Sequence, residues 1–194
     1  IKGFSEGFEK KIARGLDIMV MHGVNPKTGL AAESIGYNSF DTNTDVNSIE
    51  YDATAPDAAI DSAVAAIGDY DMTGIAMSKT YAGALATVKV NGVKQYPELG
   101  WGANPDAING VATDVNSTVS TVDGKYAYAG DFANAFKWGY ADKINFEVIE
   151  YGNPDNSEAG DLKGHNQVYL RCEAWIGWGI LDGAAFSRIE TTES

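Results

Sequence analysis

The chain has 194 residues, and 44% of them are hydrophobic, so it can bury a core of its own and disorder is not the default. Its 22 glycines predict a structure rich in turns. Acidic side chains outnumber basic ones by 27 to 14, and residues 31–194 hold 24 of the acidic ones against nine of the basic ones. This balance excludes a surface that attracts nucleic-acid phosphates or anionic lipids.

The cysteine count and the hydropathy limit the compartment. A single cysteine, Cys172, excludes an internal disulfide and a cysteine-rich zinc site, in agreement with a reducing compartment. No apolar run approaches the ~18–20 residues of a membrane span, and no signal-peptide pattern opens the chain. We therefore expect a soluble, intracellular protein. Because the sequence opens on Ile1 rather than methionine, we also expect residues upstream of it.

The first third of the chain predicts one helix and one long loop. From Phe4 to Met21, apolar side chains recur at spacings of three and four, which is typical of an amphipathic helix. Ser5 is expected to cap this helix and Gly23 to end it. Residues 24–55 are polar and prone to turns, which indicates a loop with short strand pieces.

The middle third predicts two further helices. One opens at Pro56 and ends at Gly68, and the other is capped by Ser78 and continues to about Val88. Residues 74–77 lie between them and indicate a short buried strand, whereas residues 90–122 read as loops and short strands. The side chains expected to face inward are Ile60, Ala63, Val64 and Ile67 in the first of these helices and Tyr81, Leu85 and Val88 in the second.

The last third favours β-structure. Residues 143–151 alternate as a strand does, and a Gly, Asn, Asp and Pro-rich loop follows at 152–164. Residues 167–181 then predict one long antiparallel strand. Its apolar face at strict period two comprises Val168, Leu170, Cys172, Ala174, Ile176, Trp178 and Ile180. On that face Cys172 is expected to be a buried, reduced, structural thiol.

The sequence offers little for catalysis. A catalytic triad needs a histidine, and only two are present. His22 ends the first helix, where it is expected to cap the helix C-terminus, because that end favours a cationic imidazole. His165 is expected to be a solvated loop residue. Asp69 and Asp71 are expected in a solvated turn, and the glycines around Trp101 lack the third glycine of a dinucleotide-binding loop. We predict no catalytic and no cofactor-binding residues.

One stretch imitates a calcium loop. Asp41, Asn43, Asp45 and Asn47 alternate as oxygen ligands, and Asp52 occupies the twelfth position. Val46 replaces the glycine of the sharp turn, however, and an aspartate replaces the bidentate glutamate. A polar loop without metal is favoured, and calcium binding remains the alternative.

The order of elements resembles a known family. Residues 8–17, running into Met21–His22–Gly23, resemble the helix that precedes the A domain in major capsid proteins of tailed bacteriophages, which share the Hong Kong 97 fold. Gly130–Asp131–Phe132, then residues 166–173, and finally Ala185–Phe186 resemble the P-domain strands and the closing segment of that family. The resemblance spans nearly the whole chain, although residues 24–55 and 90–125 match in character only.

The resemblance implies an α+β fold of two domains. It places a P-domain helix at residues 1–28, an A domain with a mixed sheet and flanking helices at 29–125, and P-domain strands at 126–194. The family's N-terminal arm, E-loop and most of its spine helix would precede Ile1. The 194 residues are therefore expected to fold alone without closing into shells.

The resemblance also implies a structural function. The chain would be a head-shell subunit that assembles with copies of itself, as hexamers and pentamers, into an icosahedral shell around DNA. Portal or scaffolding proteins would be further partners, with no cofactor, no sequence-specific nucleic acid and no membrane. The shell would be assembled in the bacterial cytoplasm and would form the virion capsid.

Two other functions remain open from the residues alone. An acidic, β-rich carbohydrate-binding or ligand-binding module would stack a sugar on Trp101 or on a pair formed by Trp175 and Trp178. Period two places that pair on opposite strand faces, which argues against a single platform. A small hydrolase would use surface carboxylates. The chain's four Trp and ten Tyr could equally serve as contact anchors between subunits.

Overall fold

The structure is a computed structural model that describes residues 2–32, 38–156 and 160–191. The chain divides into two compact units. The smaller one comprises residues 1–13 and 138–177, and the larger one comprises residues 14–137 and 178–194. The boundaries of these units lie after residues 13, 137 and 177, and the segments on both sides of residue 125 contribute strands to one sheet.

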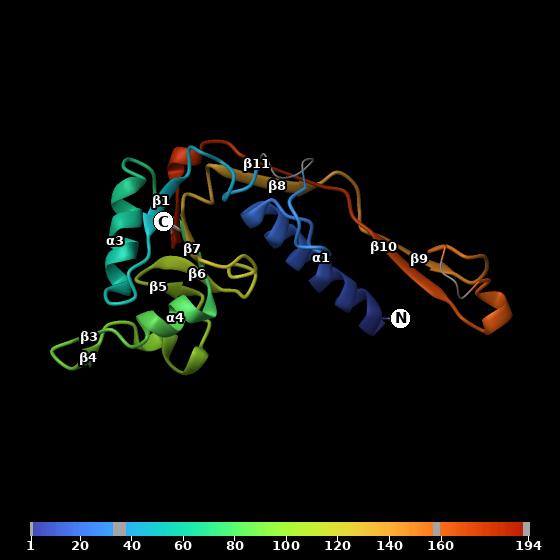
Figure 1. Cartoon of the computed structure of the whole chain (residues 1–194), viewed down its shortest axis with the longest axis horizontal. Coiled ribbons are helices and arrows are strands. Elements are labelled where there is room, and N and C mark those ends of the chain that lie inside the picture. The colour runs from blue at the N-terminus through green and yellow to red at the C-terminus, as the bar shows by residue number, and fades with distance from the viewer. Residues whose placement is uncertain (1, 33–37, 157–159, 192–194) are drawn as a thin grey trace. The chain divides into compact units, whose positions relative to one another are not determined.

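A six-stranded mixed sheet forms the centre of the larger unit (Figure 1). In spatial order its strands are β1 (Asn47–Glu50), β12 (Phe186–Glu190), β7 (Lys125–Gly130), β2 (Gly74–Met77), β6 (Val111–Val115) and β5 (Ala107–Ile108). The β12 strand lies parallel to β1 and antiparallel to β7, and β2 lies parallel to β6. The last strand of the chain is thus internal to the sheet, and the α+β architecture is confirmed.

Two helices cover one face of this sheet. They are α3 (Pro56–Ala66) and α4 (Lys79–Leu85), whose buried side chains pack against every second residue of β2 and β7. Tyr81 and Leu85 from α4 and Met77 from β2 are fully buried there. Their burial removes apolar surface from water, which is the main stabilising contribution to folding.

The opposite face holds a second, aromatic core. Phe40 lies at its centre, with its ring centroid 4.9 Å from that of Phe186 and 5.7 Å from that of Tyr128. Val20 near the end of α1 (Lys2–His22) joins this core. The sheet is therefore covered on both sides within the larger unit.

Two of the sequence motifs meet at this aromatic core. The backbone N–H of Asp131 donates to the carbonyl of Ala185 at 3.1 Å. A Cβ on Gly130 would lie 2.2 Å from the same carbonyl and 2.8 Å from the ring of Phe186. The approach of these two segments thus requires a glycine at position 130.

The helix predictions are largely confirmed. Helix α1 ends where expected, since Gly23 has φ +66° and its N–H bonds the carbonyl of Met19 at 2.9 Å. Ser5 is not the N-cap, because α1 begins at Lys2. Ser78 does cap α4 by accepting from the backbone N–H of Tyr81.

Two details of the middle helices differ from expectation. The buried side of α3 is rotated, so that Ala59 is buried while Val64 remains 43% exposed. The alanines on this side let α3 approach the sheet closely. Helix α4 ends at Leu85, and Val88 lies in the turn that leads to the hairpin of β3 (Lys89–Val90) and β4 (Val93–Lys94). Residues 90–122 otherwise form loops and short strands, as predicted, and also the 3-10 helix η1 (Pro97–Gly102), which was not predicted.

The single long strand expected at residues 167–181 is wrong. The structure has β10 (Tyr169–Glu173) paired with β9 (Asn145–Ile149), and separately β11 (Ile176–Ile180) paired with β8 (Phe136–Tyr140). The alternation of the sequence is real, but the partner strand is itself interrupted between β8 and β9. The pairing therefore changes partner near Trp175, whose carbonyl accepts from the N–H of Ala141 at 2.8 Å.

Cys172 is half-buried rather than buried, which corrects the sequence expectation. It lies in the β9–β10 ribbon of the smaller unit, which has only two strands. Phe8 of α1 packs edge-on against Phe146, with ring centroids 5.9 Å apart, while Val148 and Val168 remain exposed. A ribbon of two strands cannot bury both of its faces.

We predict that Gly130→Ala destabilises the protein by about 3 kcal/mol, because the new Cβ would force the carbonyl of Ala185 and the ring of Phe186 apart. Thermal and chemical unfolding would measure this loss. Gly139→Ala in β8 is the matched control, since its Cβ would meet nothing within 4 Å. Equal midpoints for the two variants would contradict the required close approach.

Candidate functional site

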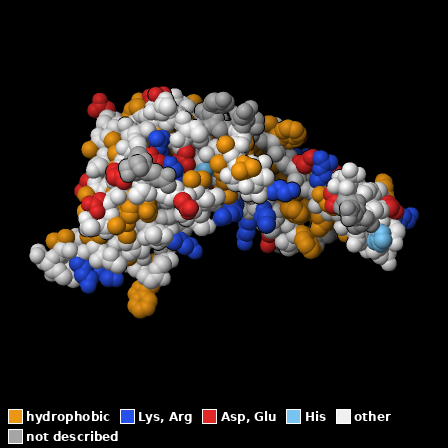
Figure 2. Space-filling view, viewed as in Figure 1, with side chains coloured by type: hydrophobic (Ala, Val, Ile, Leu, Met, Phe, Trp, Pro, Cys, Tyr) orange, Lys and Arg blue, Asp and Glu red, His pale blue; other side chains and the backbone are white. Residues whose placement is uncertain are grey.

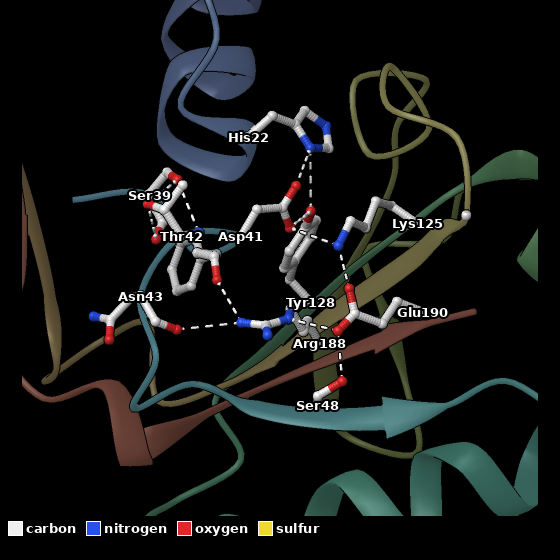
Figure 3. Close-up of polar contacts among 12 residues, drawn as sticks. His22, Ser39, Asp41, Thr42, Asn43, Ser48, Lys125, Tyr128, Arg188 and Glu190 are labelled. Carbon is white, nitrogen blue, oxygen red and sulfur yellow. Dashed lines mark hydrogen bonds and ion pairs between the residues drawn. The ribbon is translucent and has the colours of Figure 1, made fainter. Parts of the chain in front are cut away.

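A network of polar side chains lies beside the aromatic core, between the end of α1, the loop that precedes β1, and strands β7 and β12 (Figure 3). Its members are held by six ion pairs or charge-assisted hydrogen bonds, and three of them are buried, three are half-buried and one is exposed. They are His22, Asp41, Ser48, Lys125, Tyr128, Arg188 and Glu190.

His22 links three segments. Its Nε2–H donates to the carbonyl oxygen of Thr118 at 2.8 Å, and a carbonyl can only accept, so Nε2 carries a hydrogen. Its Nδ1 lies 2.8 Å from a carboxylate oxygen of Asp41, and the hydroxyl of Tyr128 donates to the other oxygen of that carboxylate at 2.7 Å. His22 does end α1 as predicted, but its buried ring binds these neighbours rather than the helix carbonyls.

Glu190 is the second anionic centre of the network. It accepts hydrogen bonds from Lys125, Ser48 and Arg188, the last at 2.7 Å. Burial by itself would raise the pKa of Glu190, but these hydrogen bonds outweigh it and lower the pKa to about 2. Lys125 also lies 3.5 Å from the Asp41 carboxylate, so it joins the two acidic centres.

Arg188 fastens the preceding loop to the sheet. Its guanidinium donates to the backbone carbonyls of Phe40 and Asn43 at 3.0 and 3.2 Å. Burial, together with the neighbouring Asp41 carboxylate, raises the pKa of Tyr128 well above its ordinary value, so its hydroxyl remains a donor. These contacts of Arg188 and Tyr128 position the loop, whereas the contacts of Glu190 join strands β1, β7 and β12, so the network has a structural role.

The network lacks the geometry of nucleophilic catalysis. In a triad, one imidazole nitrogen is oriented by a carboxylate while the other faces the nucleophile. In His22 that second nitrogen bonds the carbonyl of Thr118, which has no proton to give. The histidine therefore has no free nitrogen with which to activate a hydroxyl, a thiol or water.

The calcium-like side chains do not converge on one point. Asp41 belongs to the network, and Asn43 accepts from the backbone N–H of Asp45 at 2.9 Å. The amide of Asn47 donates to the carbonyl of Phe186 at 2.9 Å. Among the residues that the structure describes, no group of three or more His, Cys, Asp or Glu side chains is placed to hold a metal.

Each of the remaining candidates from the sequence has its own local surroundings. Asp52 accepts from the backbone and hydroxyl of Thr54, Asp69 and Asp71 flank an exposed turn after α3, and His165 is exposed in the 3-10 helix η2 (Lys163–His165). Burial and the nearby Glu9 carboxylate raise the pKa of Cys172, which disfavours the reactive thiolate.

The sequence reasoning missed the cationic half of the network. Arg188 and Glu190 alternate with the buried Ile189, and this pattern is equally typical of a strand with one solvated face. It also missed the degree of exposure of Trp101. This residue lies between two glycines, its own φ is +63°, and its side chain is fully exposed. The Gly–Trp–Gly triplet was the available signal.

We predict that Glu190→Gln destabilises the protein by about 3 kcal/mol, since it leaves Lys125 and Arg188 short of their buried counter-charge. Glu173→Gln is the control, because Glu173 forms an exposed ion pair with Arg171 and should cost less than about 1 kcal/mol. Urea unfolding at neutral pH compares them, and similar losses would show that the network contributes no more than a surface pair.

The same glutamate predicts a pH dependence. Its pKa is about 2 in the folded chain against an ordinary value of 4.5, so the ionised carboxylate stabilises the fold above pH 4.5. This contribution should be lost as the pH falls from 4.5 towards 2, and Glu190→Gln should flatten the stability curve there. An unchanged slope in the variant would contradict the assignment.

Comparisons with known proteins give a consistent result. Neither protein-family models nor curated proteins match the chain. Among solved structures, one from Mycobacterium phage Ogopogo is similar with a TM-score of 0.79 and 33% identity over 92% of this chain, and one from Gordonia phage Cozz with a TM-score of 0.79 and 25% identity over 97%. The capsid of an empty GTA particle shows the same fold, with a TM-score of 0.63 and 15% identity over 99% of the chain.

The chain spans less than two thirds of the two phage proteins, covering 63% of the first and 62% of the second, and it covers 66% of the GTA capsid chain. The likeness agrees with the resemblance found in the sequence. No helix in the described residues is both long enough and apolar enough to span a membrane. The structural likeness shows that the chain has the Hong Kong 97-like capsid fold.

Proposed function

We propose that this chain is a structural subunit of the capsid shell of a tailed phage or a GTA-like particle. The observation that carries the proposal is the fold shared over 92% of the chain, at 33% identity, with the structure from Mycobacterium phage Ogopogo. The similar GTA structure is that of a capsid, and this supplies the role. The function of such a subunit lies in its contacts with copies of itself.

The surface of the smaller unit supports this role. A two-stranded ribbon is marginally stable by itself in water. Val148 of β9 is nevertheless exposed, and so are Val168 directly before β10 and Tyr151 two residues after β9. Contacts with neighbouring subunits would cover these side chains and stabilise the ribbon.

The two compact units suggest how the domains divide. The larger unit, with its mixed sheet between α3, α4 and the end of α1, corresponds to an A domain. The smaller unit, in which the start of α1 packs on an antiparallel ribbon, corresponds to a P domain. Hexamers and pentamers of the chain would build the virion capsid in the bacterial cytoplasm, with portal or scaffolding proteins as further partners.

The other functions considered from the sequence have less support. Trp178 is half-buried, and its indole N–H donates to the carbonyl of Asn38 at 2.9 Å, so it offers no open platform for a sugar. The hydrolase alternative needs an available base, which His22 does not supply. A structural, non-enzymatic role agrees with both observations.

We expect the full-length product of the gene that encodes this chain to form closed particles of megadalton mass. The 194-residue chain should stay monomeric or form small oligomers, since it spans under two thirds of its phage relatives and would make fewer contacts. Light scattering and electron microscopy would measure both. A full-length product that remains monomeric under all assembly conditions would overturn the proposal.

We further propose that the shell encloses DNA without binding it specifically. The formal net charge of −13 gives no attraction to phosphates. We therefore expect no mobility shift of a DNA duplex at micromolar protein and physiological salt. A salt-sensitive shift in that range would contradict this expectation.

A further inference from the structure

Trp101 combines a strained backbone with a side chain that is not buried in its own subunit. Its side chain is fully exposed, and its backbone has φ +63°, a region that bulky residues rarely occupy. A single exposed hydrophobic residue is ordinary, but exposure together with backbone strain is not. Strain of this kind persists where it serves a function. The position therefore suggests a side chain that is presented to something outside the subunit.

The same unit also carries an apolar pocket. It lies between α3 and the edge of the sheet at β5, where Figure 2 shows hydrophobic side chains gathered, and its volume is about 200 Å³. Its apolar walls include Ile60, Val64, Met72, Tyr96, Ile108 and Val111. Asp61 and Asn109 also line it and supply oxygen atoms that can accept a hydrogen bond.

The pocket suits one large side chain better than a separate ligand. Sites for small molecules occupy roughly 300–1,000 Å³, which is more than this pocket offers. An indole ring matches the character of the lining, because it is apolar except for one N–H donor. Asp61 or Asn109 would accept that hydrogen. The described surface of the chain thus carries both an unburied indole and a cavity of suitable chemistry.

Charge supports the pairing of these two features. The β3–β4 hairpin, which leads directly into the η1 segment of Trp101, exposes Lys89 and Lys94. The pocket side is acidic, because Asp61 lines the pocket and Asp57 lies one turn before it on α3. Burial, and then these two carboxylates, raise the pKa of the pocket residue Tyr96. Figure 2 shows Lys and Arg side chains at the hairpin end of the unit and acidic side chains along α3. Opposite charges would orient one copy on the next.

We propose that Trp101 of one copy inserts into the pocket between α3 and β5 of a second copy, with the lysines of the hairpin facing the acidic side of α3. This inference rests on the proposed function as a shell subunit and names a contact by which neighbours recognise one another. The projecting side chain and the pocket are different surfaces, so the contact is heterologous. Repetition of such a contact builds a ring rather than a closed dimer.

Disulfide trapping tests the contact directly in the 194-residue chain. Trp101→Cys and Val64→Cys would be combined in a Cys172→Ser background, since Val64 lines the pocket and is accessible. Under mild oxidation we expect a ladder of covalent multimers on a non-reducing gel. Each single variant alone should stay largely monomeric, and a mixture of the two should stop at the dimer.

The matched control moves the cysteine from position 101 to another exposed position of the same unit. Leu30→Cys combined with Val64→Cys presents a thiol at an exposed position outside η1. A ladder as strong as that of the Trp101 pair would show random collision and overturn the proposal. Dimers that form from Trp101→Cys alone would indicate a symmetric contact and would also overturn it.

A second variant separates the contact from stability. Trp101→Gly removes the side chain and suits φ +63°, so the thermal midpoint should stay unchanged or rise by about 2 °C. The yield of closed particles from the full-length product should nevertheless fall at least tenfold. A normal yield would overturn the proposal. If wild-type particles form but the cysteine pair gives no ladder, the proposed contact is wrong and the shell role stands. If the ladder forms but the full-length product gives no particles, the contact stands and the shell role is wrong.

Discussion

The last strand of the chain, β12, holds the larger unit together. It inserts between β1 and β7, so β1 is joined to the other four strands only after the C-terminal residues are in place. Ile189 points into the core beneath α3 and α4, and Phe186 points into the aromatic core on the other side. Arg188 and Glu190 supply half of the charged network. Removal of this one strand would open both cores and the network together.

The sequence predicted the elements whose pattern is local. The amphipathic helix of α1, the proline that opens α3 and the serine that caps α4 each depend on residues within a few positions of one another. The break near Trp175 could not be predicted in the same way, because it is determined by an interruption in the opposite strand. The alternation of residues 167–181 is continuous, but strand pairing depends on both partners.

The polar network likewise has features that follow from local sequence and features that depend on distant residues. The position of His22 at the end of α1 follows from the sequence, whereas its partners Asp41 and Thr118 lie 19 and 96 residues away. Only the fold brings them into contact. The resemblance placed the Gly–Asp–Phe and Ala–Phe motifs in order along the chain without indicating that they touch. The close approach of Gly130 to Ala185 gives a physical reason for both motifs.

The charge of the chain bears on how copies can associate. At a net charge of −13, two copies repel each other at long range, so the attraction between them must come from apolar burial and from local charge pairs. Lys125 and Arg188 are committed to the internal network and cannot serve at an interface. The exposed lysines of the β3–β4 hairpin are therefore well placed to relieve the repulsion where an acidic neighbour approaches. A strongly acidic subunit can thus keep its copies apart in general and still permit contact at the surfaces where a cation and an aromatic ring project together.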